Sequence, residues 1–324
     1  MESPRRFLTP RASSKHTRVV WTPLRYPVSH PPSTMHCMAL PLPSSLSPSK
    51  VSSFQSCALA FRFSSIDKLP ETPSEPAVKG TTVHRALELF MQAKPEDRLP
   101  ELAAEHLQTA LEEMEDDPDF QSLELSDAES AKFTKDTQRM LDRYFTLEDP
   151  RQVDVVSTEQ MLEADVGDVH IRGIIDRLER DADGHLIVSD YKTGRAPSVM
   201  QERSRLGGVH FYAYLCKEIY GELPKSVQLI YLGSEPQVIS ATPTEQSVRG
   251  LERKLAAMWT AVERACERED FRPKQSALCN WCSFKEYCPA FGGDPAKAAE
   301  LAKVVNPTTE ASTVVESTAV PSTT

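Results

Sequence analysis

The sequence lacks the features that define several other classes of protein. It contains no run of about 18 apolar residues, so we expect no membrane-spanning helix and no membrane partner. It contains no secretory signal peptide with an apolar stretch, and no internal repeat. The seven cysteines, an odd number with uneven spacing, do not form the framework of a disulfide-rich secreted domain. We therefore expect a cytoplasmic protein with reduced cysteines.

An excess of positive charge is also missing. The formal net charge is -10 at pH 7, which at first argues against a nucleic-acid partner. Residues 1–50, however, carry seven Lys and Arg against one acidic residue, whereas residues 96–129 hold thirteen acidic residues and one basic residue. Such an acidic block is typical of a solvated helical face, so the total charge is compatible with a local basic groove.

Composition divides the chain into three parts. Residues 1–45 are rich in Pro, Ser, Arg and His without periodicity, which predicts a disordered basic extension. They also imitate an organelle transit peptide, but we favour an unstructured extension or a start codon placed too early, with Met35 or Met38 as the true start. A single domain is predicted over residues 46–291, with a helical insertion at about 95–150, and residues 292–324 are predicted to be a disordered tail.

Helical and β patterns follow one another within this domain. Helices are predicted from Ser47, from Gly80, and over 97–116, 127–148, 205–220 and 244–269. Strands are predicted over 153–163, 169–180, 186–191, 227–232 and 238–241, with a hairpin turn at 181–184. This order predicts an α/β fold with a mixed central sheet.

Two carboxylates and a lysine give the sharpest chemical signal. Asp176 interrupts an apolar strand, and Asp190 follows fourteen residues later, across the predicted hairpin. Lys192 lies two residues beyond Asp190, so both side chains project from the same face of a strand. Paired carboxylates repel unless a cation lies between them, and Mg²⁺ or Mn²⁺ prefers such oxygen ligands. With a lysine that can stabilise charge on a phosphate, the pattern predicts phosphodiester hydrolysis; a surface ion pair is the alternative.

A histidine on the preceding helix extends this pattern. His84 lies near the start of the helix predicted from Gly80, and Glu88 follows one turn later on the same face. The pair predicts a further metal ligand and a supporting partner for it. An ordinary surface or core histidine is the alternative.

The segments 80–88, 173–177 and 190–194 resemble, in order and approximate spacing, the successive motifs of RecB-like PD-(D/E)XK nucleases. The resemblance implies a restriction-endonuclease-like core in which Asp176, Asp190 and Lys192 are catalytic. It implies these metal ligands: His84, Asp176, Asp190 and the Tyr191 carbonyl.

The family usually continues with a Gln-x-x-x-Tyr motif on the next helix. Tyr212 fits the tyrosine, as a supporting residue, but Gly208 stands where the glutamine is expected. This departure bears on activity and not on the fold.

A cysteine cluster follows the predicted core. Cys279, Cys282 and Cys288 have C-x₂-C-x₅-C spacing, which seldom arises without a metal, and zinc and iron–sulfur cubanes both take four ligands. Cys57 lies in a segment that resembles the first cysteine motif of the iron–sulfur members of the same family, which include the CRISPR-associated RecB-like nucleases. The resemblance implies a 4Fe–4S cluster on these four cysteines, with zinc as the alternative. Such a cluster would close a loop of more than two hundred residues and stabilise the fold, by analogy with a disulfide.

The remaining cysteines, Cys37, Cys216 and Cys266, are expected to be ordinary thiols. Basic residues near the motifs are candidate contacts for DNA phosphates: Arg62, Arg172, Arg177, Arg195, Arg203 and Arg205. Aromatic residues there are candidate stacking faces for bases: Tyr191, Tyr212 and Trp281, with core packing favoured for Phe211.

These observations predict a metal-dependent deoxyribonuclease, and an exonuclease rather than an endonuclease. We expect it to act on single-stranded DNA or a free end in repair or recombination, with a helicase or recombination protein as a candidate partner. One alternative is a catalytically impaired nuclease-fold protein that binds DNA as a scaffold or helicase accessory subunit. Another is a zinc-stabilised adaptor that recruits a helicase.

Overall fold

The computed structural model describes residues 40–197 and 207–305. All of the described residues belong to one compact unit. Several features named above lie outside the described residues: Met35, Cys37, Met38, Arg203, Arg205 and most of the predicted extension and tail.

Nine α-helices and six single turns surround the sheet in the described part of the chain. The α-helices are α1 (Pro48–Ser56), α2 (Ala58–Phe61), α3 (Glu75–Gln92), α4 (Pro100–Glu115), α5 (Pro118–Gln121), α6 (Asp127–Tyr144), α8 (Gly207–Tyr220), α9 (Glu245–Arg268) and α10 (Pro295–Val305). A π-helical turn, η1, spans Arg62–Ile66. The 3-10 turns are η2 (Pro95–Asp97), η3 (Pro150–Gln152), η4 (Ala277–Trp281), η5 (Lys285–Tyr287) and η6 (Pro289–Phe291). None of these helices combines the length and apolarity that crossing a membrane would require.

One sheet of five strands lies at the centre of the described residues, in the order β1-β2-β3-β4-β5. The strands are β1 (Asp154–Val166), β2 (Val169–Arg180), β3 (Leu186–Lys192), β4 (Ser226–Tyr231) and β5 (Gln237–Ala241). β1, β2 and β3 form an antiparallel meander, α8 crosses over to make β4 parallel to β3, and β5 returns antiparallel. The predicted α/β fold with a mixed sheet is therefore confirmed.

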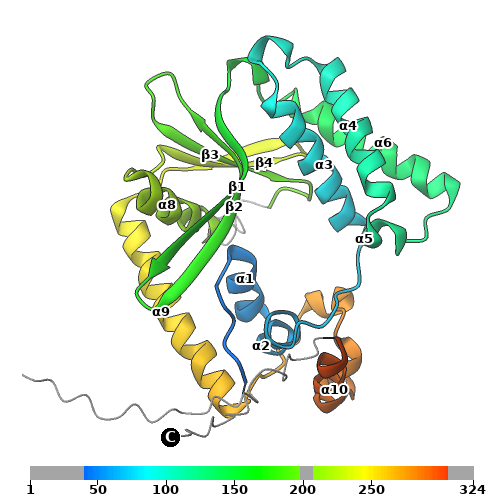
Figure 1. The fold of residues 1–324 in the computed structure, drawn as a ribbon, viewed down its shortest axis with the longest axis vertical. Coiled ribbons are helices and arrows are strands. Elements are labelled where there is room, and N and C mark those ends of the chain that lie inside the picture. The colour runs from blue at the N-terminus through cyan, green and yellow to red at the C-terminus, as the bar shows by residue number, and fades with distance from the viewer. Residues whose placement is uncertain (1–39, 198–206, 306–324) are drawn as a thin grey trace, which may run out of the picture. The chain divides into compact units, whose positions relative to one another are not determined.

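Helices cover both faces of the sheet, as Figure 1 shows. On one face, α3, α4 and α6 pack apolar side chains against Tyr191, Ile230 and Leu232. On the other face, α1, α8 and α9 pack against Val188 and Val227. Alternation along β4 explains why these residues pack on opposite faces of the sheet. Ile230 and, just after the strand, Leu232 point away from the side to which Val227 points. The burial of both faces accounts for the apolar residues that β3 and β4 place on both sides of the sheet.

Serine side chains cap the first turns of α1 and α3 and set where these two helices begin. α1 begins where the Ser and Pro pattern predicts, with the Ser47 side chain accepting the Lys50 N–H at 3.3 Å. α3 begins at Glu75, five residues before the predicted start, because Ser74 caps it by accepting the Ala77 N–H at 3.4 Å. Gly80 therefore lies inside the helix. A Cβ there would come within 3.2 Å of the Thr193 hydroxyl, so glycine allows α3 to approach the end of β3 closely.

The prediction of a disordered tail from residue 292 is wrong for α10. Ala298 on this helix is fully buried, and Leu301 and Ala302 pack against the main core. The small alanine side chains give a weak hydrophobic pattern in sequence, although they allow the helix to pack closely.

Candidate functional site

Asp190 and Lys192 lie together at the end of β3. The Lys192 ammonium contacts the Asp190 carboxylate, as their spacing on one strand predicts. Tyr212 of α8 donates its hydroxyl to Asp190 at 3.2 Å. Burial alone would lower the pKa of Lys192, but attraction to Asp190 outweighs it and the pKa is raised. The lysine is therefore a cation, and its side chain is still 44% exposed.

Gly173 allows α8 to reach this position. A Cβ on Gly173 would lie 3.2 Å from Leu215 and 3.3 Å from the Tyr212 ring, so a larger residue would push α8 away from β2. The Tyr212 hydroxyl would then move away from Asp190.

Asp176 of β2 completes the predicted carboxylate pair. It is buried and accepts the backbone N–H of Tyr191 at 2.6 Å. Burial, with repulsion from Asp190 adding to it, raises the pKa of Asp176 to about 7. A cation shared by the two carboxylates would relieve this repulsion.

His84 of α3 faces this pair from the other side. One ring nitrogen, Nδ1, lies 3.5 Å from the Asp176 carboxylate. The other, Nε2, lies 3.0 Å from the Tyr191 carbonyl oxygen, to which it can only donate. Three of the predicted ligands, His84, Asp176 and the Tyr191 carbonyl, are therefore neighbours. The negative charge of the fourth, Asp190, also attracts a proton to the His84 ring.

A further acidic residue, Glu159 of β1, reaches the same place and was missed by the sequence reasoning. Its carboxylate lies 3.7 Å from His84 Nδ1. The strand residues on either side of Glu159 pair with those on either side of Asp176, so the two acids lie opposite each other. The short turn between Val166 and Val169 fixes this register, and counting back from it would have revealed the pair.

Glu88 does not support His84 as predicted. Its carboxylate instead pairs with Arg85 at 2.8 Å on the same helix and accepts from Gln92 at 3.5 Å. The position that it was expected to fill is taken by Glu159.

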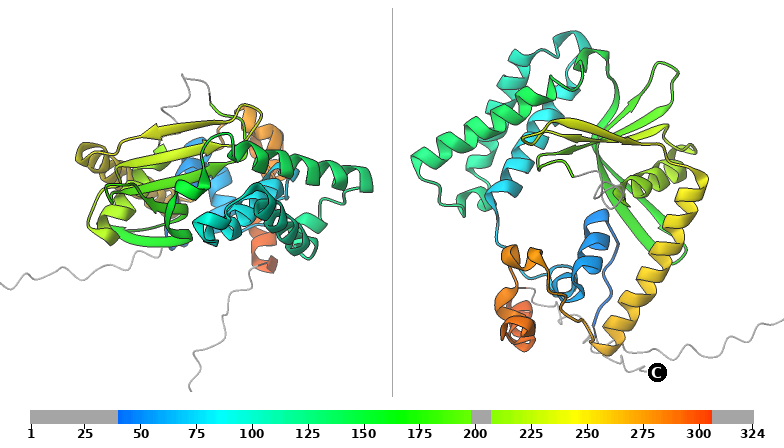
Figure 2. Two further views of the ribbon diagram at one scale, coloured as in Figure 1. Left: turned by 90° about the horizontal axis from the view of Figure 1, so that it is seen from above. Right: turned by 180° about the vertical axis from the view of Figure 1, so that it is seen from behind.

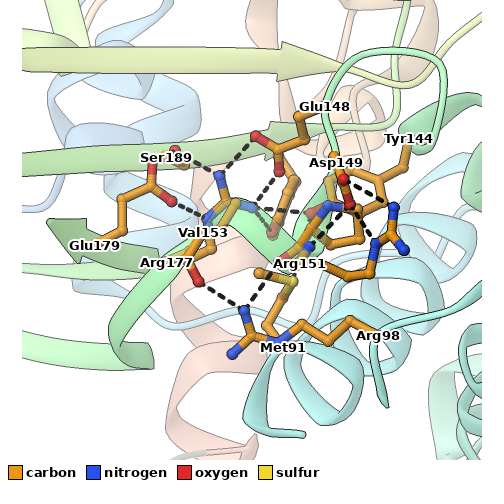
Figure 3. Close-up of polar contacts among 12 residues, drawn as sticks. Met91, Arg98, Tyr144, Glu148, Asp149, Arg151, Val153, Arg177, Glu179 and Ser189 are labelled. Atoms are coloured by element: carbon orange, nitrogen blue, oxygen red, sulfur yellow. Dashed lines mark hydrogen bonds and ion pairs between the residues drawn. The ribbon is translucent and has the colours of Figure 1, made fainter. Parts of the chain in front are cut away.

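Arg177, a predicted DNA contact, is fully buried (0% side-chain exposure) and lies in a polar network behind the site (Figure 3). It forms ion pairs with Glu148 and, at 2.6 Å, with Glu179. It also donates hydrogen bonds to three hydroxyls: Tyr144 at 3.1 Å, Ser189 at 3.2 Å and Tyr191 at 3.0 Å. This burial corrects the prediction, because a phosphate could not reach the guanidinium.

The contacts of Arg177 join α6 and the residues after it to β2 and β3. Arg98 continues the network by donating to the carbonyls of Pro150 at 3.0 Å and Val153 at 2.8 Å, where the helices lead into β1 (Figure 3). Tyr191 belongs to both systems, since its hydroxyl lies in the network and its backbone holds Asp176 and His84. The network therefore positions the backbone of the candidate site.

The other predicted DNA contacts differ in exposure. Arg62 is mostly buried and pairs with Asp67 at 3.1 Å, so it is not available to DNA. Arg195 is 72% exposed on its side chain and pairs only loosely with Glu235 at 3.2 Å. Of the predicted stacking faces, Tyr191 is buried in the core, whereas Trp281 is 80% exposed.

A cleft of about 490 Å³ opens beside Asp190 and Lys192. Its lining comes from α1, β3 and the residues after it, β4, α8 and α9: Pro48, Val51, Ser52, Gln55, Asp190, Lys192, Gly194, Arg195, Gly208, Phe211, Tyr212, Leu229, Tyr231, Leu251 and Lys254. Gly208, where the motif glutamine was expected, has open space around its Cβ position. Lys192, Arg195 and Lys254 make the cleft locally basic within an acidic chain.

The four cysteines of the predicted cluster line a second cavity of about 410 Å³. Cys57 comes from the α1–α2 junction, and the other three come from the segment after α9, which lies beside α2 (Figures 1 and 2). Burial raises the pKa of Cys282, and repulsion from the other three thiols adds to it. Backbone N–H groups point at two sulfurs, from Lys274 to Cys57 at 3.5 Å and from Ser276 to Cys279 at 3.4 Å.

The two other described cysteines lie apart from this cavity. Cys216 and Cys266 are buried and unpaired, and burial raises the pKa of the Cys216 thiol to about 12 and of the Cys266 thiol to about 11.

Asp190 and Lys192 line a locally basic cleft at the end of β3, and Asp176 acts on Asp190 from the neighbouring strand β2. The chain belongs to the PD-(D/E)XK nuclease superfamily, whose sequence model matches residues 45–289. No curated protein sequence matches the chain. Among solved structures it is similar to a proposed exonuclease from Eubacterium rectale, with 11% identity, a TM-score of 0.47, and coverage of 74% of this chain and 87% of that chain. It is also similar to SSO0001, with 19% identity, a TM-score of 0.29, and coverage of 41% and 60%. The assignment to the family depends on the sequence match.

Proposed function

We propose that this chain is a divalent-metal-dependent deoxyribonuclease of the RecB-like branch, acting as an exonuclease on single-stranded DNA in repair or recombination. The observation that carries the proposal is the convergence of Asp176, Asp190 and Lys192 beside one basic cleft. Membership of the nuclease superfamily supports it.

The donor set fits a hard divalent cation. Asp176, Asp190 and His84 would hold Mg²⁺ or Mn²⁺, because a divalent cation would relieve the repulsion between the two carboxylates. When bound, the ion would act as a Lewis acid on the phosphate and on water. The Tyr191 carbonyl, the further ligand implied by the family resemblance, accepts from His84 in this structure.

The side chains around the donor set have separate roles. The Tyr191 N–H and the Tyr212 hydroxyl orient Asp176 and Asp190. The Lys192 ammonium would stabilise negative charge that develops on the scissile phosphate. Arg195 and Lys254 line the same cleft and would contact neighbouring phosphates of a strand.

The four cysteines would hold an iron–sulfur cluster. Among the described residues, no three of the cysteine sulfurs lie within 4.8 Å of one another. The sulfurs of a tetrahedral zinc site would be about 3.8 Å apart. The wider spacing and the N–H groups aimed at the sulfurs favour an iron–sulfur cluster, whose role would be to join the two ends of the domain.

Gel assays on labelled DNA test the proposal. Protein purified without oxygen is incubated with Mn²⁺ or Mg²⁺ and with linear or circular, single- or double-stranded DNA. We expect degradation of linear single strands, and a loss of roughly 10²–10³-fold in rate for Lys192→Ala. Lys132→Ala, the same change at an exposed position on α6, is the matched control and should leave the rate unchanged.

Other results would revise or overturn the proposal. Cleavage of circular strands would indicate an endonuclease. DNA binding without cleavage by folded, metal-loaded protein would instead support the impaired scaffold, for which Gly208 in place of the motif glutamine is the supporting observation.

A further inference from the structure

We propose that Glu159 is a third carboxylate ligand of the divalent cation, bound together with Asp176 and with Nδ1 of His84. The inference rests on the proposed function and extends its ligand set beyond the residues that the sequence motifs contain. Glu159 lies on β1, upstream of the motif on β2 and outside the motif on α3.

The ligand atoms of the three residues already surround one point. A ring nitrogen of His84 and carboxylate oxygens of Glu159 and Asp176 all lie within 4.8 Å of one another. They come from three separate elements, α3, β1 and β2, so the fold and not local sequence brings them together. An ion among them would replace the contacts of 3.5 and 3.7 Å that Nδ1 of His84 makes with the two carboxylates.

The hydrogen bond on the far side of the His84 ring fixes which nitrogen faces the acids. Because Nε2 donates its hydrogen to the Tyr191 carbonyl, the neutral ring directs the lone pair of Nδ1 toward Glu159 and Asp176. A histidine that binds metal through one nitrogen commonly donates from the other to a backbone carbonyl. The Tyr191 carbonyl then orients His84.

The charges at the site match one divalent ion. With all three carboxylates ionised and His84 neutral, as metal binding requires, Glu159, Asp176 and Asp190 contribute three negative charges. Lys192 contributes one positive charge, which leaves a formal charge of -2. No lysine or arginine pairs with Glu159 within residues 40–197 and 207–305. A cation between the acids would neutralise this charge.

The backbone at Glu159 also differs from that of its neighbours. Its φ of 44° places a non-glycine residue in the left-handed region in the middle of β1. Such a conformation is unfavourable for a side chain with a Cβ and is concentrated at functional sites. A functional role of the Glu159 side chain would account for this unfavourable backbone conformation.

Manganese binding to metal-free protein tests the proposal without depending on cleavage. Binding is measured by calorimetry and by the electron paramagnetic resonance of free Mn²⁺ for wild type, Glu159→Gln and Glu163→Gln. Glu163 lies on the same strand with a side chain 51% exposed, so its variant is the matched control. We expect at least a tenfold weaker affinity for Glu159→Gln and no change for Glu163→Gln.

Thermal unfolding in a chelator shows whether the variant is folded. Metal-free Glu159→Gln should melt at or above the temperature of wild type, because a repulsion with Asp176 is removed, and the advantage should reverse when Mn²⁺ is added. Equal Mn²⁺ affinity of wild type and Glu159→Gln would overturn the proposal and leave the proposed function intact. A wild type that binds Mn²⁺ through Glu159 but degrades no DNA would overturn the proposed function alone.

Discussion

Replacing Arg177 with methionine should remove the cation that pairs with the buried Glu179 and the half-buried Glu148. Glu148 and Glu179 both pair with the guanidinium, and Glu179 is itself buried. Removing one partner from a buried ion pair costs about 3–5 kcal/mol, because the remaining charge is left in a medium of low polarity. For a domain of this size, such a loss corresponds to a fall in melting temperature of roughly 6–20 °C.

The loss should depend on pH in a defined direction. Burial already raises the pKa of Glu179 even with Arg177 present. Without the arginine, the folded pKa of Glu179 would lie still further above its unfolded value. The destabilisation should therefore be largest at pH 8 and should shrink toward pH 5, as the carboxyls take up protons.

Urea unfolding of wild type and Arg177→Met at pH 5.5 and pH 8 measures this effect. Arg151→Met is the matched control, because Arg151 is exposed and pairs only with Asp149 two residues away. Adding Glu148→Gln and Glu179→Gln to Arg177→Met should recover much of the lost stability. A loss below about 1 kcal/mol, or an equal loss at the two pH values, would refute the reasoning.

Two further predictions concern the bound groups. Because burial and repulsion from Asp190 raise the pKa of Asp176 to about 7, Mn²⁺ must displace a proton below that pH, and the affinity should fall about tenfold for each pH unit below 7. Calorimetry measures the Mn²⁺ affinity from pH 5.5 to 8.5, and an affinity that does not change with pH would contradict this prediction. Protein purified without oxygen should be brown and hold iron and sulfide, and Cys282→Ser should lose both, whereas Cys216→Ala, outside the cavity, should keep them. Colourless protein with one zinc per chain would contradict the iron–sulfur cluster.

The sheet could be predicted because its signals are local. Alternation, the turn at 181–184 and the D-x-K spacing fix β2 and β3, and the antiparallel pairing of these strands then brings Asp176 near Asp190. The cysteine spacing likewise predicts one group of side chains, and the structure brings Cys57 to the cavity lined by the other three.

The incorrect predictions concern partners that local patterns do not encode. Helix spacing suggested Glu88 for His84, but Arg85 competes for it on the same helix. Arg177 follows Asp176 in sequence and was counted with the surface arginines, although alternation along β2 turns it into the core. Its partners at residues 144 and 148 lie at the end of α6 and just after it, where packing depends on contacts distant in sequence.

Tyr191 shows how a single strand can serve both faces of the sheet. Asp190 and Lys192 face the cleft, so the residue between them must point to the opposite face, where its ring packs among α3, α4 and α6 and its hydroxyl meets Arg177. Its backbone meanwhile holds Asp176 through the N–H and His84 through the carbonyl. A change in the packing of α4 and α6 would therefore move the candidate ligands through Tyr191. We expect such a change to alter metal affinity, although no side chain of α4 or α6 belongs to the ligand group found among the described residues.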